Sequence, residues 1–140
     1  MDFFSFVLNN WYLFLALIVI LVLLLMPSLG GRLGGYQDLE PSDAVKMINR
    51  ENAVVVDVRD QGEWNTGHIL GAKHVPLGEL PQRLKKLEKF KDKPLIVNCR
   101  SGARSARACA QLRKAGFEKV YNLKGGVTGW LNAGFPLTKE

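Results

Sequence analysis

Hydrophobic residues are distributed along this chain in two different ways. Residues 3–26 are an almost uninterrupted apolar run, in which Ser5, Asn9 and Asn10 are the only polar residues apart from the Tyr12 hydroxyl. After residue 37, short apolar runs alternate with stretches in which apolar residues recur every three or four positions. The first pattern is typical of a segment that leaves water, and the second is typical of a folded domain built from strands and helices.

The apolar run is long enough to cross a membrane. As a helix, residues 3–26 would reach about 36 Å, against a hydrocarbon core of about 30 Å. A cleaved signal peptide is the alternative, but such a peptide begins with basic residues, and here the only charged side chain before the run is that of Asp2. Met26-Pro27-Ser28 is also a poor cleavage site. The sequence therefore predicts an uncleaved, membrane-embedded anchor over residues 1–27.

The residues after the anchor predict its orientation. Basic residues are absent before the run and begin with Arg32 after it. Because lysine and arginine remain on the cytoplasmic side, we expect a single-pass protein with its N-terminus outside and the rest of the chain in the cytoplasm. Residues 28–36 contain four glycines and predict a flexible linker. Residues 37–140 remain for one domain of common size.

Residues 37–140 alternate between expected strands and expected helices. Apolar, β-branched runs predict strands at 53–56, 72–77, 95–97 and 120–123. Helical periodicity predicts helices at 41–50, 80–90, 106–113 and 126–131. Three glycines within residues 61–71 indicate a loop. This alternation predicts an α/β fold with a mostly parallel sheet, helices on both faces, and ligands bound at the carboxyl ends of the strands.

The stretch that follows the expected strand at 95–97 carries the candidate chemistry. Cys99 ends the strand, a short loop of small and basic residues follows, and a helix then begins. Backbone N–H groups in such a loop lack intrahelical partners and can converge on an anion beside the sulfur. With Arg100 and Arg104 nearby, this environment favours the thiolate, which is the nucleophilic form of cysteine.

The length of the loop limits what it can hold. Four residues separate Cys99 from Arg104, namely Arg100, Ser101, Gly102 and Ala103. Such a short loop encircles only a small anion or a terminal sulfur, and its small side chains let the backbone come close. The reaction that fits is displacement at sulfur, in which Cys99 takes the outer sulfur of a donor as a persulfide and passes it to a thiol. The loop amides would stabilise the persulfide, and the arginines would attract an anionic donor.

Motifs on both sides of this loop resemble those of rhodanese-like sulfurtransferases. The resemblance covers roughly Leu39 to Leu137 and rests on Asp57-Val58-Arg59, Glu63-Trp64, Gly67-His68-Ile69 with Gly71-Ala72, Cys99 to Ser105, and Gly125-Gly126 with Trp130. It implies a parallel five-stranded sheet flanked by helices, an active-site loop over residues 99–104 and a persulfide on Cys99. With its anchor, the chain resembles the membrane-anchored single-domain rhodaneses of bacteria, which implies a place in the inner membrane.

Two other functions fit parts of the pattern. Thiol-dependent phosphatases and arsenate reductases of the related fold have a similar loop, but with one more residue between cysteine and arginine to fit a tetrahedral oxyanion. A non-enzymatic rhodanese-fold adaptor at the membrane is the other alternative. Inactive relatives often lack the cysteine, whereas this chain retains Cys99 and both loop arginines.

Other chemistry-bearing residues are expected to have structural roles. Asp57 and Arg59 are expected to join Glu63 in a polar network that braces the loop, with capping of local turns as the alternative. The resemblance places His68 in a structural turn, and His74 has no partner that the sequence identifies. Cys109 lies among alanines on a helix and is expected to be buried. A disulfide with Cys99 is not expected, which agrees with a cytoplasmic domain.

Charge adds little to this picture. Nineteen Lys and Arg against thirteen Asp and Glu give a net charge of +6. The densest basic run is expected to be a solvated helix face, with weak attraction to acidic headgroups as a second interpretation, and comprises Lys85, Lys86, Lys89, Lys91 and Lys93. We expect no metal, cofactor or nucleic acid. The expected partners are a small sulfur donor, a thiol acceptor or protein persulfide, and a membrane protein.

Overall fold

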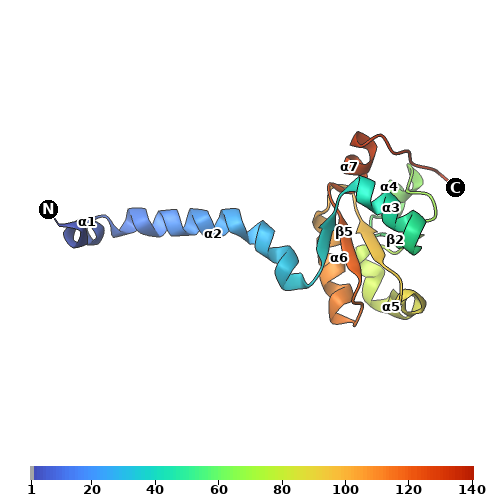
Figure 1. Ribbon diagram of the computed structural model, residues 1–140, viewed down its shortest axis with the longest axis horizontal. Coiled ribbons are helices and arrows are strands. Elements are labelled where there is room, and N and C mark those ends of the chain that lie inside the picture. Colours follow the sequence, from blue (N-terminus) through green and yellow to red (C-terminus); the bar gives the residue numbers. More distant parts are fainter. Residues whose placement is uncertain (1) are drawn as a thin grey trace. The chain divides into compact units, whose positions relative to one another are not determined.

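The protein is described by a computed structural model with two compact units, Met1–Leu33 and Gly34–Glu140 (Figure 1). The structure describes the backbone of residues 2–140 and the side chains of residues 2–25 and 35–140. Each unit is considered by itself. The linker predicted at residues 28–36 lies mostly in the segment whose side chains are not described, and it stays a prediction.

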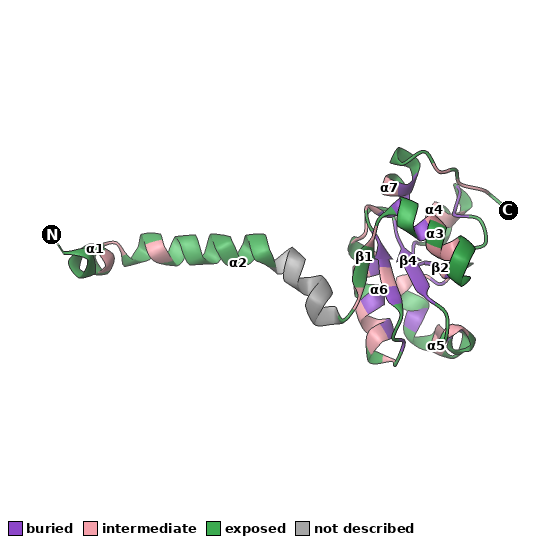
Figure 2. Ribbon diagram, in the orientation of Figure 1, coloured by how far each residue is buried: buried purple, intermediate pink, exposed green. Residues whose placement is uncertain are grey.

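The first unit contains two helices, α1 (Phe3–Asn9) and α2 (Trp11–Gly34). Asp2 caps α1, because its carboxylate accepts the Ser5 N–H at 2.9 Å. The apolar side chains described on α2 are almost all exposed (Figure 2). Within the described residues, no single helix has the length and apolar character needed to cross a membrane. Phe3–Asn9 and Trp11–Leu25 have them only together, with a bend of 77° between them.

The second unit is built on one sheet of five parallel strands, as the resemblance implied. The strands are β1 (Gln37–Leu39), β2 (Val54–Asp57), β3 (Lys73–His74), β4 (Leu95–Asn98) and β5 (Val120–Leu123). Their order across the sheet is β1-β5-β4-β2-β3. All four residues of β4 are buried, because this central strand is covered on both faces. The strand predicted at 72–77 is shorter, with only two residues paired.

Helices cover both faces of the sheet (Figure 1). The helices are α3 (Pro41–Glu51), α4 (Gln61–Asn65), α5 (Leu80–Leu87), α6 (Ala103–Lys114) and α7 (Gly126–Asn132), with 3-10 turns at Leu77–Glu79 and Glu88–Phe90. One hydrophobic cluster joins Leu80 of α5 and Leu112 of α6 to Val97 of β4. A second joins Ala44 of α3 and Trp130 of α7 to the other face of the sheet. The prediction of a doubly covered parallel sheet is confirmed.

The loop expected at residues 61–71 is wrong for its first part, since Gln61–Asn65 form helix α4. The Asp60 carboxylate accepts the Glu63 N–H at 2.8 Å and so caps the helix. Asp60 and Glu63 are the first and fourth residues of a capping pattern, which the glycines of this segment obscured. The correction matters for the site, since α4 holds Glu63 and Trp64 in fixed positions.

The carboxyl ends of the three central strands lie side by side. Asp57 of β2 is in register with Asn98 of β4, and Val97 of β4 with Asn122 of β5. Asp57 and Asn98 are fully buried, and Asn122 is nearly so. This edge brings polar side chains together immediately before Cys99, as expected for a ligand site in a parallel sheet.

Candidate active site

The loop after β4 folds tightly around the Cys99 sulfur. Cys99 is buried, with 1% of its surface exposed. Gly102 caps α6 with a φ of +109°, a conformation that favours glycine, and its N–H donates to Cys99 Sγ at 3.0 Å. The Ser105 hydroxyl lies 3.4 Å from the same sulfur. The predicted arrangement of a thiol at a strand end, encircled by loop donors, is therefore present.

Hydrogen bonds to the sulfur stabilise the thiolate. Burial is the largest single influence and by itself raises the pKa of Cys99. The Ser105 hydroxyl and the backbone N–H groups of Ser105, Gly102 and Ser101 act in the opposite direction and together lower the pKa of Cys99 below its ordinary value. The neutral donors of the loop are the main cause of this lowering, and the charge of Arg104 also interacts with the thiolate.

Ser105 and Asn122 are functional residues that the sequence did not single out. The Ser105 hydroxyl is also within hydrogen-bond distance of the Gly102 carbonyl and of Asn122 Oδ1. Asn122 Nδ2 donates to the Gly102 carbonyl at 3.2 Å. A polar asparagine inside the apolar strand 120–123 was the available signal, since buried amides need partners. The two side chains fix the turn at Gly102 and hold the hydroxyl beside the sulfur.

A Ser105→Ala variant is expected to raise the pKa of Cys99, because one donor to the thiolate is removed while burial is unchanged. Less thiolate is then present at acid pH. The rate of sulfur transfer should fall several-fold at about pH 6 and much less at about pH 9, a shift that a pH–rate profile measures. The matched control is Ser101→Ala, which leaves the backbone N–H donors in place and should keep the parent profile. A parent-like profile for Ser105→Ala would contradict this role.

The start of α7 packs directly on the loop backbone. The N–H groups of Val127 and Thr128 donate to the carbonyls of Cys99 at 2.9 Å and Arg100 at 3.1 Å. Gly126 has a φ of +57°, and a Cβ at this position would meet the Cys99 carbonyl and lie 2.7 Å from the Arg100 carbonyl carbon. The Gly125-Gly126 pair thus permits an approach that no other residue type allows.

Arg104 is held by Glu63 across the site. Its guanidinium donates two hydrogen bonds to the Glu63 carboxylate, at 2.7 and 2.8 Å. The pair links the first turn of α6 to α4, and the side chains of Arg104 and Glu63 are 38% and 26% exposed. The Glu63 carboxylate thus binds one edge of the guanidinium, and the prediction that Arg104 attracts an anionic donor stays a prediction.

The ion pair lowers the pKa of Glu63 to about 2, chiefly through the hydrogen bonds from Arg104. A depressed carboxyl pKa stabilises the fold fully above the unfolded value, near 4.5, and the contribution is lost as the pH falls toward 2. We expect Glu63→Gln to remove this acid-dependent part of the free energy of unfolding, about 0.5–1 kcal/mol after solvent screening of a half-exposed pair. Urea unfolding at several pH values measures it. A Glu63→Gln protein that keeps the parent's acid dependence would contradict the assignment.

Comparison with known proteins identifies the family to which this domain belongs. The family model of the rhodanese-like domain matches residues 40–133. The chain belongs to the rhodanese-like family. It is 36% identical to the Escherichia coli K12 protein YibN, over 89% of this chain and 88% of that protein. It is 32% identical to the thiosulfate sulfurtransferase GlpE of Glaesserella parasuis, over 73% of this chain and 93% of that protein.

A solved structure supports the same assignment. The rhodanese-related protein of Thermoplasma volcanium has a TM-score of 0.68 and 31% identity to this chain, and the match covers 75% of this chain and all of that one. The resemblance inferred from the motifs is therefore confirmed. At the level of the family, this rhodanese-like domain is a sulfurtransferase-type enzyme.

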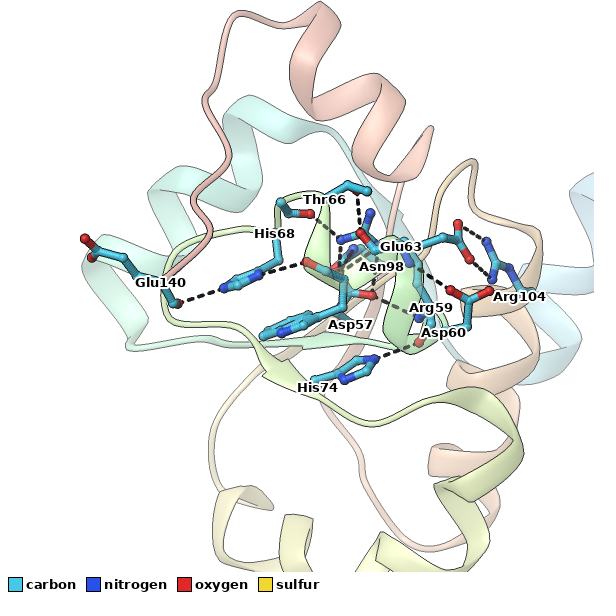
Figure 3. A network of polar contacts seen from close by, with 12 residues as sticks. Asp57, Arg59, Asp60, Glu63, Thr66, His68, His74, Asn98, Arg104 and Glu140 are labelled. Atoms are coloured by element: carbon cyan, nitrogen blue, oxygen red, sulfur yellow. Dashed lines mark hydrogen bonds and ion pairs between the residues drawn. The ribbon is translucent and has the colours of Figure 1, made fainter.

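A buried ion pair between Asp57 and Arg59 contacts Asn98, the residue that precedes the active-site loop (Figure 3). Arg59 contacts the Asp57 carboxylate at 2.8 Å and donates to the Gly67 carbonyl at 2.7 Å. Asn98 Nδ2, one residue before Cys99, donates to the same carboxylate at 3.2 Å. The sequence placed Glu63 in this group, but its carboxylate pairs with Arg104. The bracing role predicted for Asp57 and Arg59 agrees with these contacts.

Trp64 of the rhodanese-like domain is stacked between two histidines. Its ring centroid is 3.6 Å from that of His68 and 4.6 Å from that of His74. His68 is buried and His74 Nε2 lies 2.8 Å from the Arg59 carbonyl. His74 therefore has partners that the sequence did not reveal, and both histidines are bound into the fold by these contacts.

A pocket of about 600 Å³ opens beside the loop. Arg100, Thr66 and Thr128 are exposed at its wall, and the buried Arg59 also lines it. Val127 and Leu131 provide an apolar side. Arg100 thus lies where the sequence expected a substrate-facing charge. The pocket is larger than an inorganic anion requires, and it leaves space for the body of an organic sulfur compound.

Cys109 lies in the core of the domain and not in the active site. It is fully buried in the cluster beneath α6, and burial is the main reason why its pKa is raised. Both cysteines are free thiols. The prediction of a buried, structural Cys109 is confirmed, since a protonated thiol without access to solvent is unreactive.

Proposed function

We propose that the protein transfers sulfane sulfur from a donor such as thiosulfate or a persulfide to a thiol acceptor through a persulfide on Cys99. The observation that carries the proposal is the Cys99 sulfur held by the Gly102 N–H and the Ser105 hydroxyl, with a lowered pKa. These donors favour the thiolate, and the N–H groups of the same loop would favour the anionic outer sulfur of a persulfide.

The reaction is a pair of displacements at sulfur. The Cys99 thiolate attacks the outer sulfur of thiosulfate, a new S–S bond forms, and sulfite leaves with the electron pair of the broken bond. An acceptor thiolate then attacks the outer sulfur of the Cys99 persulfide, and Cys99 leaves as thiolate. The acceptor becomes a persulfide, and the enzyme returns to its starting state without an external oxidant. Arg100 is exposed and placed to attract the anionic donor.

The contacts of Arg104 favour sulfur transfer over phosphate-ester hydrolysis. A phosphatase loop needs its arginine over the cysteine to bind the equatorial oxygens of the phosphoryl group. Here two N–H groups of the guanidinium donate to the Glu63 carboxylate. The loop also closes on the sulfur by a direct Gly102 N–H bond, which leaves a small cradle.

The experiment is a single-turnover assay with thiosulfate. The purified full chain should release sulfite in a burst equal to the concentration of active enzyme, before any acceptor is added. Added glutathione should then start a second turnover, and p-nitrophenyl phosphate should stay intact. Hydrolysis of the phosphate ester that needs Cys99, without a sulfite burst, would overturn the proposal.

We further propose that this chemistry takes place at the cytoplasmic face of the bacterial inner membrane. The support is the apolar segment of residues 3–26 and the basic residues that follow it. The full chain should sediment with membranes, and the domain should resist protease added to spheroplasts. Cleavage of the domain from outside would reverse the orientation, and recovery of the uncleaved chain in the soluble fraction would reject the anchor.

A further inference from the structure

A second hollow in the domain lies outside the active-site pocket. It has a volume of about 320 Å³ and is formed by β3, α5 and the 3-10 turn that follows α5. His74 lines it and lies 2.8 Å from the carbonyl of Arg59, which lines the active-site pocket. We call this hollow the basic groove, and its charged residues are Lys73, Arg83, Lys86 and Lys89.

The basic groove is positively charged, and the described side chains that line it include no acidic one. Arg83 pairs with the exposed carboxylate of Glu79 at 2.9 Å. Among the described side chains, no carboxylate lies within ion-pair distance of Lys73, Lys86 or Lys89. Three cations that line one small concavity repel each other, and an anionic ligand would relieve this repulsion.

The wall of the groove between these charges is apolar. Phe90, Leu87 and Val75 line it, and Phe90 remains half-buried against the core. The ammonium groups of Lys89 and Lys93 lie 5.1 and 6.0 Å from the centre of the Phe90 ring. An apolar centre surrounded by charged groups is the arrangement of a protein-binding surface, in which an apolar anchor is buried and polar contacts surround it.

We propose that the basic groove binds an acidic protein segment that carries an apolar anchor residue. A membrane surface is the other source of negative charge, but a flat layer of headgroups cannot enter a concave site. An extended segment can place carboxylates on Lys73, Lys86 and Lys89 while its apolar side chain reaches Phe90. The groove is joined to the active-site pocket through the contact of His74 with the Arg59 carbonyl.

The test uses the full chain in phosphatidylcholine nanodiscs and a fluorescent octapeptide of six glutamates with one leucine and one phenylalanine. Binding is followed by fluorescence anisotropy, and contact is mapped by the rate at which individual lysines are acetylated. We expect the peptide to slow acetylation of Lys86 and Lys89 and to leave Lys46 on α3 unchanged. A peptide with serines in place of leucine and phenylalanine should bind at least about tenfold more weakly. No sulfur donor is present, so the result does not depend on the proposed transferase activity.

The decisive variant is Lys86→Glu with Lys89→Glu, which should weaken peptide binding by about tenfold or more. The matched control is Lys46→Glu with Arg50→Glu, which changes the net charge equally on the other face of the sheet. It should bind the peptide like the parent. Equal weakening by the control pair, or equal binding of the serine peptide, would show unspecific charge attraction and overturn the proposal. Protection of Lys86 and Lys89 by phosphatidylserine nanodiscs, with none by the peptide, would assign the groove to lipid.

Discussion

A Cys99→Ser variant of the full chain is expected to lose sulfur transfer from thiosulfate by at least about a thousandfold. The serine hydroxyl is protonated at neutral pH and cannot take an outer sulfur from the donor. The Gly102 N–H and the Ser105 hydroxyl would still be present, but with no thiolate to stabilise. Sulfite release in single turnover and thiol persulfide formation at steady state both measure the loss.

The matched control for this prediction is Cys109→Ser. Cys109 is fully buried, so the substitution tests whether a second thiol contributes. We expect lower stability from a hydroxyl placed in the core, but a sulfite burst that still equals the folded enzyme concentration. A Cys99→Ser protein that transfers sulfur as fast as the parent, or a Cys109→Ser protein that folds without any burst, would contradict the assigned nucleophile.

A Gly126→Ala variant is expected to lose both stability and activity. Its Cβ would meet the Cys99 carbonyl and the Arg100 backbone, at a φ of +57° that alanine rarely adopts. The backbone must then move, and the hydrogen bonds from Val127 and Thr128 to the loop are strained or lost. We expect a loss of about 2–4 kcal/mol in the free energy of unfolding, with a sulfite burst reduced at least about tenfold in the protein that remains folded.

Gly78→Ala is the control for the glycine effect. Among the described atoms beyond its chain neighbours, none lies within 4 Å of a Cβ built at Gly78, so the added methyl group meets open space. This variant should unfold within about 0.5 kcal/mol of the parent and keep its activity. If Gly126→Ala proves as stable and active as Gly78→Ala, the close packing of α7 on the loop does not determine the position of Cys99.

The order of most strands and helices could be predicted from the sequence because short apolar runs alternate with helical periodicity along the domain. β4 is fully buried, and its apolar run therefore predicted a strand correctly. β1 was not predicted from the hydrophobic pattern, since Gln37–Leu39 is a short edge strand with two exposed residues. β3 was overestimated for a related reason, because only Lys73 and His74 are paired and the apolar residues around them pack without strand pairing.

The nucleophile could be predicted from local spacing, but its surroundings could not. Cys99 and the small residues after it are adjacent in sequence, so their geometry follows from one loop. The contacts that tune the loop join distant residues, such as Ser105 with Asn122 and Arg104 with Glu63. Charge alone suggested that Arg104 acts on the donor, and only the fold shows that α4 brings a carboxylate to it. The same holds for His74, whose partners Arg59 and Trp64 meet it through tertiary packing.

The most direct test of the account is the mass of the protein after exposure to thiosulfate without an acceptor. The intact chain should gain the mass of one sulfur atom, and peptide mapping should place that atom on Cys99. The added mass should disappear on incubation with glutathione and should be absent from the Cys99→Ser variant. A gain located on Cys109, or no gain in a folded protein that does release sulfite, would contradict the persulfide mechanism.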